Sequence, residues 1–419
     1  MTELAIGGIP ARTLAEEYQT PLYVYDEDKL KNGMKGFKQG FTSHHFDTKI
    51  LYASKAFQTI EMLHLVEEQG LGLDVVSGGE IYTALAANFP KESIYFHGNN
   101  KTLEELTYAL ESGLTHFVAD NLMEIELLEA LCKKYSKKIQ IMLRLNVGIE
   151  AHTHEYIVTA HIDSKFGMSY ESEDCQQALQ LIKKSRYLLL EGFHAHIGSQ
   201  IFDLTAWFAE IDQLISYLND FDETLSLNLG GGFGIRYTEN DRPLPIEDSL
   251  RQLIRHTEET LEQQRLKINQ LIIEPGRSIV GEAGTTLYTI GFIKQTPHKT
   301  YYFVDGGMTD NIRPALYQAE YSCDIATKLS EEKTEKVTVA GKMCESGDIV
   351  IKEAFLPVAE SGDILAVYAT GAYGYSMSSN YNRTVVPAVV FVKDGKSRLV
   401  VRRQEYSDLL KGEVAYEHP

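Results

Sequence analysis

Short apolar runs alternate with longer amphipathic stretches from about residue 30 to about residue 275 of the chain. The apolar runs predict buried β-strands, and the stretches between them carry apolar residues every three or four positions, which predicts helices. Strands are expected at residues 49–54, 71–77, 94–98, 116–120, 139–147, 188–198, 225–230 and 271–276, and helices at 60–70, 79–89, 102–112 and 124–135. Strands buried on both faces indicate a parallel sheet, so about eight βα units in roughly 250 residues favour a closed (β/α)8 TIM-like barrel over an open doubly wound sheet.

The pattern changes after Gly276. The rest of the sequence consists of β-like runs separated by Gly, Pro and Asp, which predicts a second, mainly antiparallel β domain of the sandwich or barrel type. Residues 21–26 (PLYVYD) are also β-like and are expected to pair into that domain. The predicted organisation is a barrel over residues 30–276 and a β domain built from residues 1–29 and 277–419.

Composition and charge narrow the class of protein. Apolar residues make up 43% and charged residues 24% of the 419 residues, as in ordinary soluble globular proteins. The 40 Lys and Arg against 59 Asp and Glu give a net charge of −19, which argues against nucleic-acid and anionic-membrane partners. The four cysteines show no CxxC spacing, so neither a zinc site nor a disulfide framework is expected. The sequence has no leader-like start and no apolar stretch of about 18 residues, so a cytoplasmic location is expected.

Two candidate sites follow predicted barrel strands, at the strand ends where barrels of this kind carry their active sites. Lys55 in YASKAF follows the first strand, where desolvation would make its amine a nucleophile; the alternative is a solvated loop lysine. The glycine run GGGFG at 230–234 would let backbone N–H groups wrap a phosphate. It could also be an ordinary turn, but a dinucleotide-binding fingerprint is excluded because a loop follows instead of a helix.

A pair of histidines follows in the order of the chain. His194 and His196 are two residues apart on one predicted strand, so they are expected to face the same way. They could be metal ligands, as in metal-dependent barrel hydrolases, but no second set of ligands has convincing spacing, so no metal is predicted. A buried or ring-stacking histidine is favoured instead. Gly198 and Ser199 follow in HIGSQ and would suit an anion.

Charged and polar groups recur later in the chain. EPGR places Glu274 and Arg277 at the close of the last barrel strand, either as an ion pair before a turn or as a carboxylate that keeps a ring nitrogen protonated beside a carboxylate-gripping arginine. IRPALY adds Arg313 and Tyr317. CESGD places the Cys344 thiol beside a carboxylate, although a lone cysteine is more often a buried filler.

Together and in this order, the motifs resemble those of the fold type III pyridoxal-phosphate-dependent decarboxylases, whose barrel is of the alanine-racemase type. The resemblance runs from about residue 20 to about residue 405 and is carried by YASKAF, HGNNK (97–101), SKFG (164–167), HIGSQ, GGGFG, EPGR, CESGD and GAYGYSMSSNYN (371–382). Two small departures, Phe57 where relatives often have Asn and Val147 where proline is common, leave the reactive residues in place.

The resemblance implies that pyridoxal 5'-phosphate is the cofactor and that the active site is shared across a homodimer, with CESGD arriving from the second subunit. It implies that Lys55 carries the cofactor as a Schiff base and that Cys344 donates a proton after CO2 leaves. The further cofactor-binding residues that it implies are Asp74, His196, Ser199, Gly231, Glu274, Gly276, Arg277 and Tyr373.

The groups available for the far end of the substrate distinguish the members of this family. Arg277, Arg313 and Tyr317 could hold a distal carboxylate while Glu345 pairs with a distal ammonium. The resemblance implies that Tyr373 approaches the substrate as well as the cofactor. That set favours meso-2,6-diaminopimelate, giving L-lysine and CO2. The alternatives are a decarboxylase of ornithine, arginine or carboxynorspermidine, an alanine racemase, a non-catalytic decarboxylase-like binding protein, or a metal-dependent barrel hydrolase.

Overall fold

The computed structural model describes residues 3–149 and 164–414. Their internal contacts divide the chain into two compact units. The barrel unit comprises Gly33–Gly234 and Arg242–Ser278, and the β unit comprises Met1–Asn32, Ile235–Asp241 and Ile279–Pro419.

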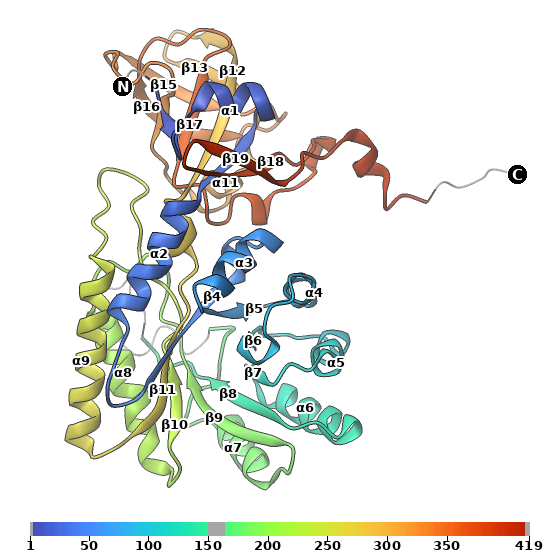
Figure 1. Cartoon of the computed structure of the whole chain (residues 1–419), viewed down its shortest axis with the longest axis vertical. Helices are drawn as coiled ribbons and strands as arrows, with labels where there is room; N and C mark the ends of the chain where they lie inside the picture. The colour runs from blue at the N-terminus through green and yellow to red at the C-terminus, as the bar shows by residue number, and fades with distance from the viewer. Residues whose placement is uncertain (1–2, 150–163, 415–419) are drawn as a thin grey trace, which may run out of the picture. The chain divides into compact units, whose positions relative to one another are not determined.

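Eight parallel strands of the barrel unit close on themselves in the order β10-β11-β4-β5-β6-β7-β8-β9 (Figure 1). They are β4 (Asp47–Ala53), β5 (Gly72–Val75), β6 (Ile94–Phe96), β7 (His116–Ala119), β8 (Ile139–Arg144), β9 (Leu188–His194), β10 (Leu225–Asn228) and β11 (Ile268–Ile273). Each lies within, or overlaps, a strand expected from its apolar run. The predicted (β/α)8 barrel is confirmed.

Helices alternate with the barrel strands along the chain. They are α2 (Glu27–Gly40), α3 (Ile60–Glu68), α4 (Gly78–Ala86), α5 (Leu103–Ser112), α6 (Leu122–Tyr135), α7 (Glu173–Lys184), α8 (Thr205–Tyr217) and α9 (Ile246–Gln264). Helix α2 precedes the first barrel strand and the others connect successive strands; α3 to α6 each pack on the next helix, and α8 packs on α9. Short polar residues end several βα loops by accepting a backbone N–H of the next helix: Thr59, Ser77, Thr102, Asn121 and Ser172. Such N-caps fix where each helix begins and therefore fix the length of the loop above each strand.

The inside of the barrel is layered because side chains alternate along each strand. Leu51, Tyr95, Val118, Met142 and Ile272, from five strands, form one buried apolar cluster, and each is at most 1% exposed. The residue two positions further along each of these strands points to the same interior. Whatever occupies those positions therefore lies at the carboxyl ends of the strands, directly above the apolar cluster.

The β unit is built on a sheet in the order β16-β15-β13-β12-β3-β18-β19, with β17 pairing with both β12 and β14. The strands are β3 (Leu22–Asp26), β12 (Gly284–Gln295), β13 (Thr300–Val304), β14 (Cys323–Ile325), β15 (Glu335–Ala340), β16 (Ile349–Leu356), β17 (Ile364–Tyr368), β18 (Ala388–Lys393) and β19 (Lys396–Val401), with the helix α1 (Ala11–Tyr18) and the short β1 (Ala5–Ile6) and β2 (Ile9–Pro10) at the N-terminal end. The strand expected at 21–26 is β3, which lies between β12 and β18. Most pairings are antiparallel; β13 with β15 and β18 with β3 are parallel.

Two elements of the β unit depart from a plain alternation of buried and exposed strand residues. IRPALY forms the helix α11 (Arg313–Tyr317), which begins at an arginine followed by a proline at a favourable first-turn position. In strand β16, Lys352 and Glu353 are two successive exposed charges. In residues 3–149 and 164–414, every helix is too short or too polar to cross a membrane, and the cytoplasmic location stays a prediction.

One buried carboxyl group in the barrel unit carries a stability prediction. Glu210 on α8 is 0% exposed, and neither of its oxygens has a hydrogen-bond partner among the described residues. Burial raises the pKa of Glu210 well above its usual 4.5, so the folded protein holds it as a neutral acid. We expect Glu210→Met to raise the free energy of unfolding by about 1–3 kcal/mol at pH 7. Methionine is similar in size to glutamate and removes the buried carboxyl group that has no hydrogen-bond partner among the described residues.

The pH dependence separates this cause from a simple packing gain. Below pH 4.5, Glu210 is protonated in both the folded and the unfolded protein, so the pH does not affect its contribution to stability. As the pH rises from 4.5 towards the raised folded pKa, the unfolded chain ionises first and the parent protein loses stability. The gap between Glu210→Met and the parent in urea unfolding should therefore widen between about pH 5 and pH 8. The exposed Glu262 on α9 is the matched control, and Glu262→Gln should show no such trend. A gap that is constant with pH would contradict the prediction.

Candidate active site

Polar side chains replace apolar ones at the carboxyl ends of the barrel strands. Two residues beyond Tyr95, Met142 and Ile272 of the apolar cluster come His97, Arg144 and Glu274. Asp74 on β5, His194 at the end of β9 and Asn228 at the end of β10 are also buried there. The alternation of each strand therefore places a ring of titratable groups at the end of the barrel where such folds do their chemistry.

Glu274 is the centre of this ring and is 6% exposed. Asn228 Nδ2 donates to Glu274 Oε1 at 2.7 Å, and His97 Nε2 lies 2.8 Å from the same oxygen. His194 Nε2 lies 3.2 Å from Glu274 Oε2. Both carboxylate oxygens are thus held by nitrogen groups from three other strand ends, which fixes the orientation of the side chain.

Two opposing effects set the charge of Glu274. Burial acts to raise its pKa, but His97 and His194 outweigh burial and lower the pKa well below the usual 4.5. Burial lowers the pKa of His194 to about 4, so its imidazole is neutral at pH 7 and donates Nε2–H to the carboxylate. This assignment leaves His194 Nδ1 as a buried acceptor without a hydrogen-bond partner among the described residues. The site therefore holds a buried carboxylate in its ionised form.

Lys55 lies beside this ring. It follows β4 in the short helix η1 (Ser54–Ala56) and its side chain is exposed. Burial raises the pKa of Asp74, whose Oδ1 lies 3.8 Å from His97 Nε2, and the charges of His97 and Lys55 act against this increase. The predicted Lys55, Asp74 and Glu274 therefore lie at one end of the barrel.

His196 lies beyond the end of β9, so the expectation that it shares a strand with His194 is wrong. His194 is 1% exposed, whereas His196 is exposed and lines a pocket of about 330 Å³ with Arg144, Asn146 and Gly198 among others. Desolvation by surrounding atoms, and then the charges of Lys55 and Arg144, lower the pKa of His196 to about 3. Its Nδ1 accepts the Gly231 N–H at 3.3 Å, as a neutral imidazole can. Strand β9 is four residues shorter than the expected strand at 188–198. Beyond it, the chain reaches Gly198, where φ is +138°.

The glycine run packs too closely on its neighbours for any side chain. A Cβ on Gly231 would lie 2.3 Å from the Glu274 carbonyl oxygen, and one on Gly232, where φ is +123°, would lie 2.6 Å from the Gly198 carbonyl oxygen. Nearby, Arg277 Nη2 donates to Ser199 Oγ at 3.1 Å, which brings together two further predicted residues. Gly276, between Glu274 and Arg277 in the sequence, is buried against Ala53 at the end of β4.

These groups fit pyridoxal phosphate. The buried carboxylate of Glu274 matches a protonated ring nitrogen, and the Lys55 amine stands at a strand end where a carbonyl could be bound. Asp74 Oδ1 and Ser54 Oγ are further buried polar atoms without a hydrogen-bond partner among the described residues. The backbone N–H groups of the glycine run, together with the Ser199 hydroxyl and the Arg277 guanidinium, are groups that commonly bind phosphate.

The remaining predicted residues lie in the β unit. Arg313, 7% exposed, donates from Nη1 to Tyr321 Oη at 2.7 Å and to Tyr237 Oη at 3.0 Å, and its guanidinium lies 5.9 Å from the ring centroid of Tyr373. Tyr373 is half-buried and has a left-handed backbone, with φ of 61°. Tyr317, on the same helix as Arg313, is 62% exposed. The structure thus groups Arg313 with Tyr373 and leaves Tyr317 at the surface of the β unit.

Cys344 and Glu345 are exposed in the loop between β15 and β16. The Glu345 carboxylate accepts a short hydrogen bond from the Tyr381 hydroxyl. The Asp348 carboxylate of the same loop is buried and accepts the backbone N–H groups of Met308 and Met343 at 2.6 and 2.8 Å. The motif is therefore a loop with a fixed backbone and exposed reactive side chains.

Arg144, Asn228 and Glu80 were missed at the sequence level, and His97 was noted only as part of HGNNK, without a role. Glu80 accepts the Val76 N–H at 2.7 Å, and burial raises its pKa to about 7, with the charges of Asp74 and Lys55 acting in opposite directions. The signal that could have found His97 and Arg144 is the two-residue step beyond an inward apolar position. Asn228 and Glu80 show no such spacing in the sequence, and only their hydrogen bonds in the structure identify them as site residues.

Three groups of this ring are also of the kinds that bind metal ions. His97, His194 and Glu274 offer ligand atoms that all lie within 4.8 Å of one another. However, both Glu274 oxygens are already held by nitrogen groups, and Asn228 Nδ2 is a donor that does not bind metal. The arrangement is that of a hydrogen-bonded carboxylate, and the expectation of no metal stays a prediction.

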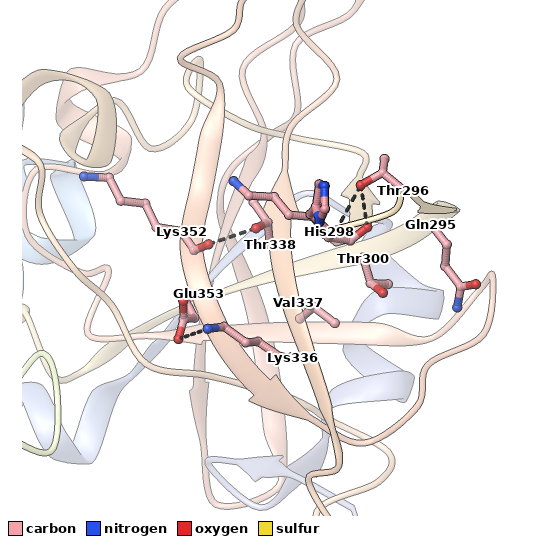
Figure 2. Close-up of a pocket in the computed structure, with 10 residues that line it drawn as sticks. Gln295, Thr296, His298, Thr300, Lys336, Val337, Thr338, Lys352 and Glu353 are labelled. Carbon is pink, nitrogen blue, oxygen red and sulfur yellow. Dashed lines mark hydrogen bonds and ion pairs between the residues drawn. The ribbon is translucent and has the colours of Figure 1, made fainter.

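A larger hollow of about 420 Å³ lies in the β unit, between the turn after β12 and strands β15 and β16 (Figure 2). Lys336 pairs with Glu353 at 2.8 Å, and Thr338 Oγ1 donates to the Lys352 carbonyl at 2.9 Å. Its lysines are solvated, with the Lys336 side chain 59% exposed, and it contains none of the predicted site residues. The barrel end is therefore the better candidate.

Comparison with known proteins agrees with this geometry. The model of the pyridoxal-binding domain of pyridoxal-dependent decarboxylases matches residues 27–281. Diaminopimelate decarboxylase of Bacillus subtilis (strain 168) is 49% identical over 99% of this chain and 96% of its own length. The enzyme of Staphylococcus aureus (strain COL) is 45% identical over 97% of each chain.

Solved structures give the same result. The crystal structure of diaminopimelate decarboxylase from M. jannaschii in co-complex with L-lysine has a TM-score of 0.93 and 32% identity, covering 99% of this chain and 96% of that one. A lysine/ornithine decarboxylase from Vibrio vulnificus, at 20% identity and a TM-score of 0.75 over 91% of this chain and 97% of that one, shares the fold alone. The resemblance inferred from the motifs is confirmed. The chain belongs to the pyridoxal-dependent decarboxylases, and within them to the diaminopimelate decarboxylase family.

Proposed function

We propose that this protein decarboxylates meso-2,6-diaminopimelate to L-lysine and CO2, with pyridoxal 5'-phosphate bound at the carboxyl ends of the barrel strands. The observation that carries the proposal is the buried, ionised Glu274, held by Asn228, His97 and His194 at that end of the barrel. Relatives named diaminopimelate decarboxylase, 41–49% identical over nearly the whole chain, support the choice of substrate.

The barrel residues divide the work of holding the cofactor. Lys55 would bind it through its amino group, Glu274 would keep a proton on its ring nitrogen, and neutral His196 would pack on its ring. When bound, pyridoxal phosphate supplies the conjugated system that accepts the electrons of the breaking bond to the carboxylate. The phosphate would be bound by Ser199 with the backbone at Gly231 and Gly276, and Asp74, Arg277 and Tyr373 complete the set of proposed cofactor contacts.

The stereochemistry of the reaction assigns the other groups. Because the product is L-lysine, the carboxylate leaves from the D centre, and the L-configured end is the distal head of the substrate. Arg277, Arg313 and Tyr317 would hold the carboxylate of that head, with Tyr373 nearby, and Glu345 would pair with its ammonium. Both hydrogens of Arg313 Nη1 are used on tyrosines, which orients the guanidinium and leaves the fork of Nε and Nη2 for a carboxylate.

The Cys344 thiol is the proposed proton donor after CO2 leaves, because a thiol gives up a proton readily and is re-protonated by solvent. Its place in an exposed loop supports delivery to a second copy of the chain, so we infer a homodimer with shared active sites. Light scattering of the purified protein tests this inference, and a monomer that is fully active would refute it.

The direct test is the formation of lysine from meso-diaminopimelate by purified protein with added pyridoxal phosphate. We expect L-lysine from the meso isomer and none from the LL isomer. A yellow protein that forms no lysine would support the proposed cofactor but indicate that the substrate is one of the polyamine precursors. A colourless protein that takes up no cofactor would favour the non-catalytic alternative.

Arg313→Lys should separate charge from geometry at the distal carboxylate. Lysine keeps the positive charge but cannot form the two-pronged contact, so we expect KM for meso-diaminopimelate to rise about 10- to 100-fold. Binding of D-lysine as an inhibitor should be nearly unchanged, because it has a distal ammonium and no distal carboxylate. Arg402→Lys, which alters an exposed two-pronged pair with Asp408, is the control. Equal losses for both ligands would exclude the carboxylate contact.

A further inference from the structure

Glu345 has its side chain held by another side chain rather than by its own loop. Within the CESGD loop, Asp348 anchors the backbone: its carboxylate accepts the Met343 and Met308 N–H groups, and its own N–H donates to the Glu345 carbonyl at 3.1 Å. None of these bonds reaches the Glu345 carboxylate. Its hydrogen-bond partner among the described residues is the hydroxyl of Tyr381.

The segment that carries Tyr381 is tethered on both sides. Before it, the Ser379 N–H donates to the Thr309 carbonyl at 2.9 Å. Asn380 Nδ2 donates to Gln404 Oε1 at 2.6 Å, and the same oxygen accepts the Val386 N–H at 3.0 Å. These bonds cross-link residues 379–386 to the rest of the β unit, so the position of the Tyr381 ring is not left to a free loop.

The backbone directly after Tyr381 is in an unfavourable conformation. Asn382 and Arg383 have φ of 52° and 58°, two successive non-glycine residues in the left-handed region. Asparagine tolerates this region but arginine rarely adopts it. Residues held in this way cluster at sites where a side chain must be aimed. The conformation turns the chain at the point where Tyr381 meets Glu345.

One short stretch of the chain holds the segments that carry both partners. Met308 N–H binds the CESGD loop through Asp348, and the Thr309 carbonyl binds the Tyr381 segment. Residues 308 and 309 therefore help to place both the Glu345 carboxylate and the Tyr381 hydroxyl.

We propose that Tyr381 is a positioning residue for substrate recognition: its hydroxyl fixes the Glu345 carboxylate in the orientation that receives the distal ammonium. The inference rests on the proposed function, because it presumes that Glu345 contacts the substrate. Tyr381 is 45% exposed, so its hydroxyl has water as an alternative partner, yet it is directed at the carboxylate. The hydrogen bond to Glu345 raises the pKa of Tyr381, so the phenol stays protonated and remains a donor through the neutral range.

Tyr381→Phe tests the proposal, because it removes the hydroxyl and keeps the ring. We expect KM for meso-diaminopimelate to rise about 5- to 20-fold with kcat within about twofold, since a ground-state contact is loosened and the reacting atoms are untouched. The inhibition constant of D-2-aminopimelate, which lacks the distal ammonium, should not change. Tyr406→Phe, at a tyrosine of the β unit that is 81% exposed, should behave as the parent.

A double-mutant cycle separates positioning from a merely structural role. If Tyr381 acts through Glu345, adding Tyr381→Phe to Glu345→Gln should raise KM no further, whereas independent effects would multiply. Multiplying effects, a fall in kcat at constant KM, or equal weakening of D-2-aminopimelate would each overturn the proposal. If the parent and Tyr406→Phe do not turn over meso-diaminopimelate, the proposed function has failed; if they do and Tyr381→Phe matches them, only this inference has failed.

Discussion

Lys55→Ala is expected to abolish turnover, with kcat at least about 1,000-fold below that of the parent, because the covalent attachment point of the cofactor is lost. Lys55 follows β4 beside Asp74 and the Glu274 ring, and its charge acts on both Asp74 and His196. The purified variant should also lack the visible absorbance of lysine-bound pyridoxal phosphate. Steady-state assays and an absorbance spectrum check both expectations.

Lys49 is the matched control for that experiment. It lies on the same strand β4, six residues earlier, and its Nζ donates to the hydroxyl of Tyr95, a member of the apolar cluster, at 3.3 Å. Burial lowers the pKa of Lys49, so the control is a lysine whose amine is also affected by its surroundings. Lys49→Ala should keep the absorbance and the turnover. An active, yellow Lys55→Ala protein would remove Lys55 from its proposed role.

Glu274→Gln should lower kcat about 100- to 1,000-fold, the usual range for losing one fixed electrostatic group at a reacting centre. A neutral amide cannot hold a proton on the ring nitrogen, and its NH2 group would face Asn228 Nδ2 or a histidine nitrogen. We also expect a loss of about 1–3 kcal/mol in the free energy of unfolding, because a buried donor would be left without a partner.

The pH profile gives this prediction a second test. The pKa of Glu274 is lowered well below 4.5, so its contribution is present above that pH and is lost only as the pH falls through the depressed folded pKa. The activity gap between Glu274→Gln and the parent should therefore be constant from about pH 5 to pH 9, whereas a carboxylate of ordinary or raised pKa would let the gap shrink towards the acid side.

Glu191→Gln is the control variant for Glu274. The Glu191 carboxylate is also largely buried in the barrel unit, and it contacts Tyr95 Oη at 2.7 Å and His116 Nδ1 at 2.8 Å. Its removal should reduce stability without a comparable loss of kcat. Equal kinetic effects of the two variants would mean that Glu274 acts through the fold and not at the cofactor.

The barrel was predictable because its strands are apolar on both faces, and because capping residues such as Ser77 and Thr102 mark where each helix begins. In the β unit the pattern is weaker. Strands with one solvated face admit charges, as Lys352 and Glu353 do in β16, and a five-residue helix such as α11 is too short to show a period. Local sequence therefore specified the element types best where burial was complete.

The candidate site was predictable in its parts but not in its connections. The motifs identified Lys55 and Glu274, yet the groups that keep Glu274 ionised come from three other strand ends, at 46, 80 and 177 residues of separation. No local spacing encodes such contacts. The place of His196 was misjudged for a related reason: β9 ends at His194, so the expected strand is shorter than its apolar run suggests.

The apolar cluster beneath the strand ends also limits how hydrogen isotopes reach the site. Leu51, Val118, Met142 and Ile272 offer no exchangeable side-chain hydrogen, and Tyr95, the remaining member, donates its hydroxyl away to Glu191. Burial further raises the pKa of Tyr95, which makes it a poor relay. Deuterium from solvent must then enter from the side on which the strands end. The amount of deuterium incorporated into the product would therefore measure how readily solvent reaches the site from the strand ends, because the apolar cluster closes the barrel interior on the other side.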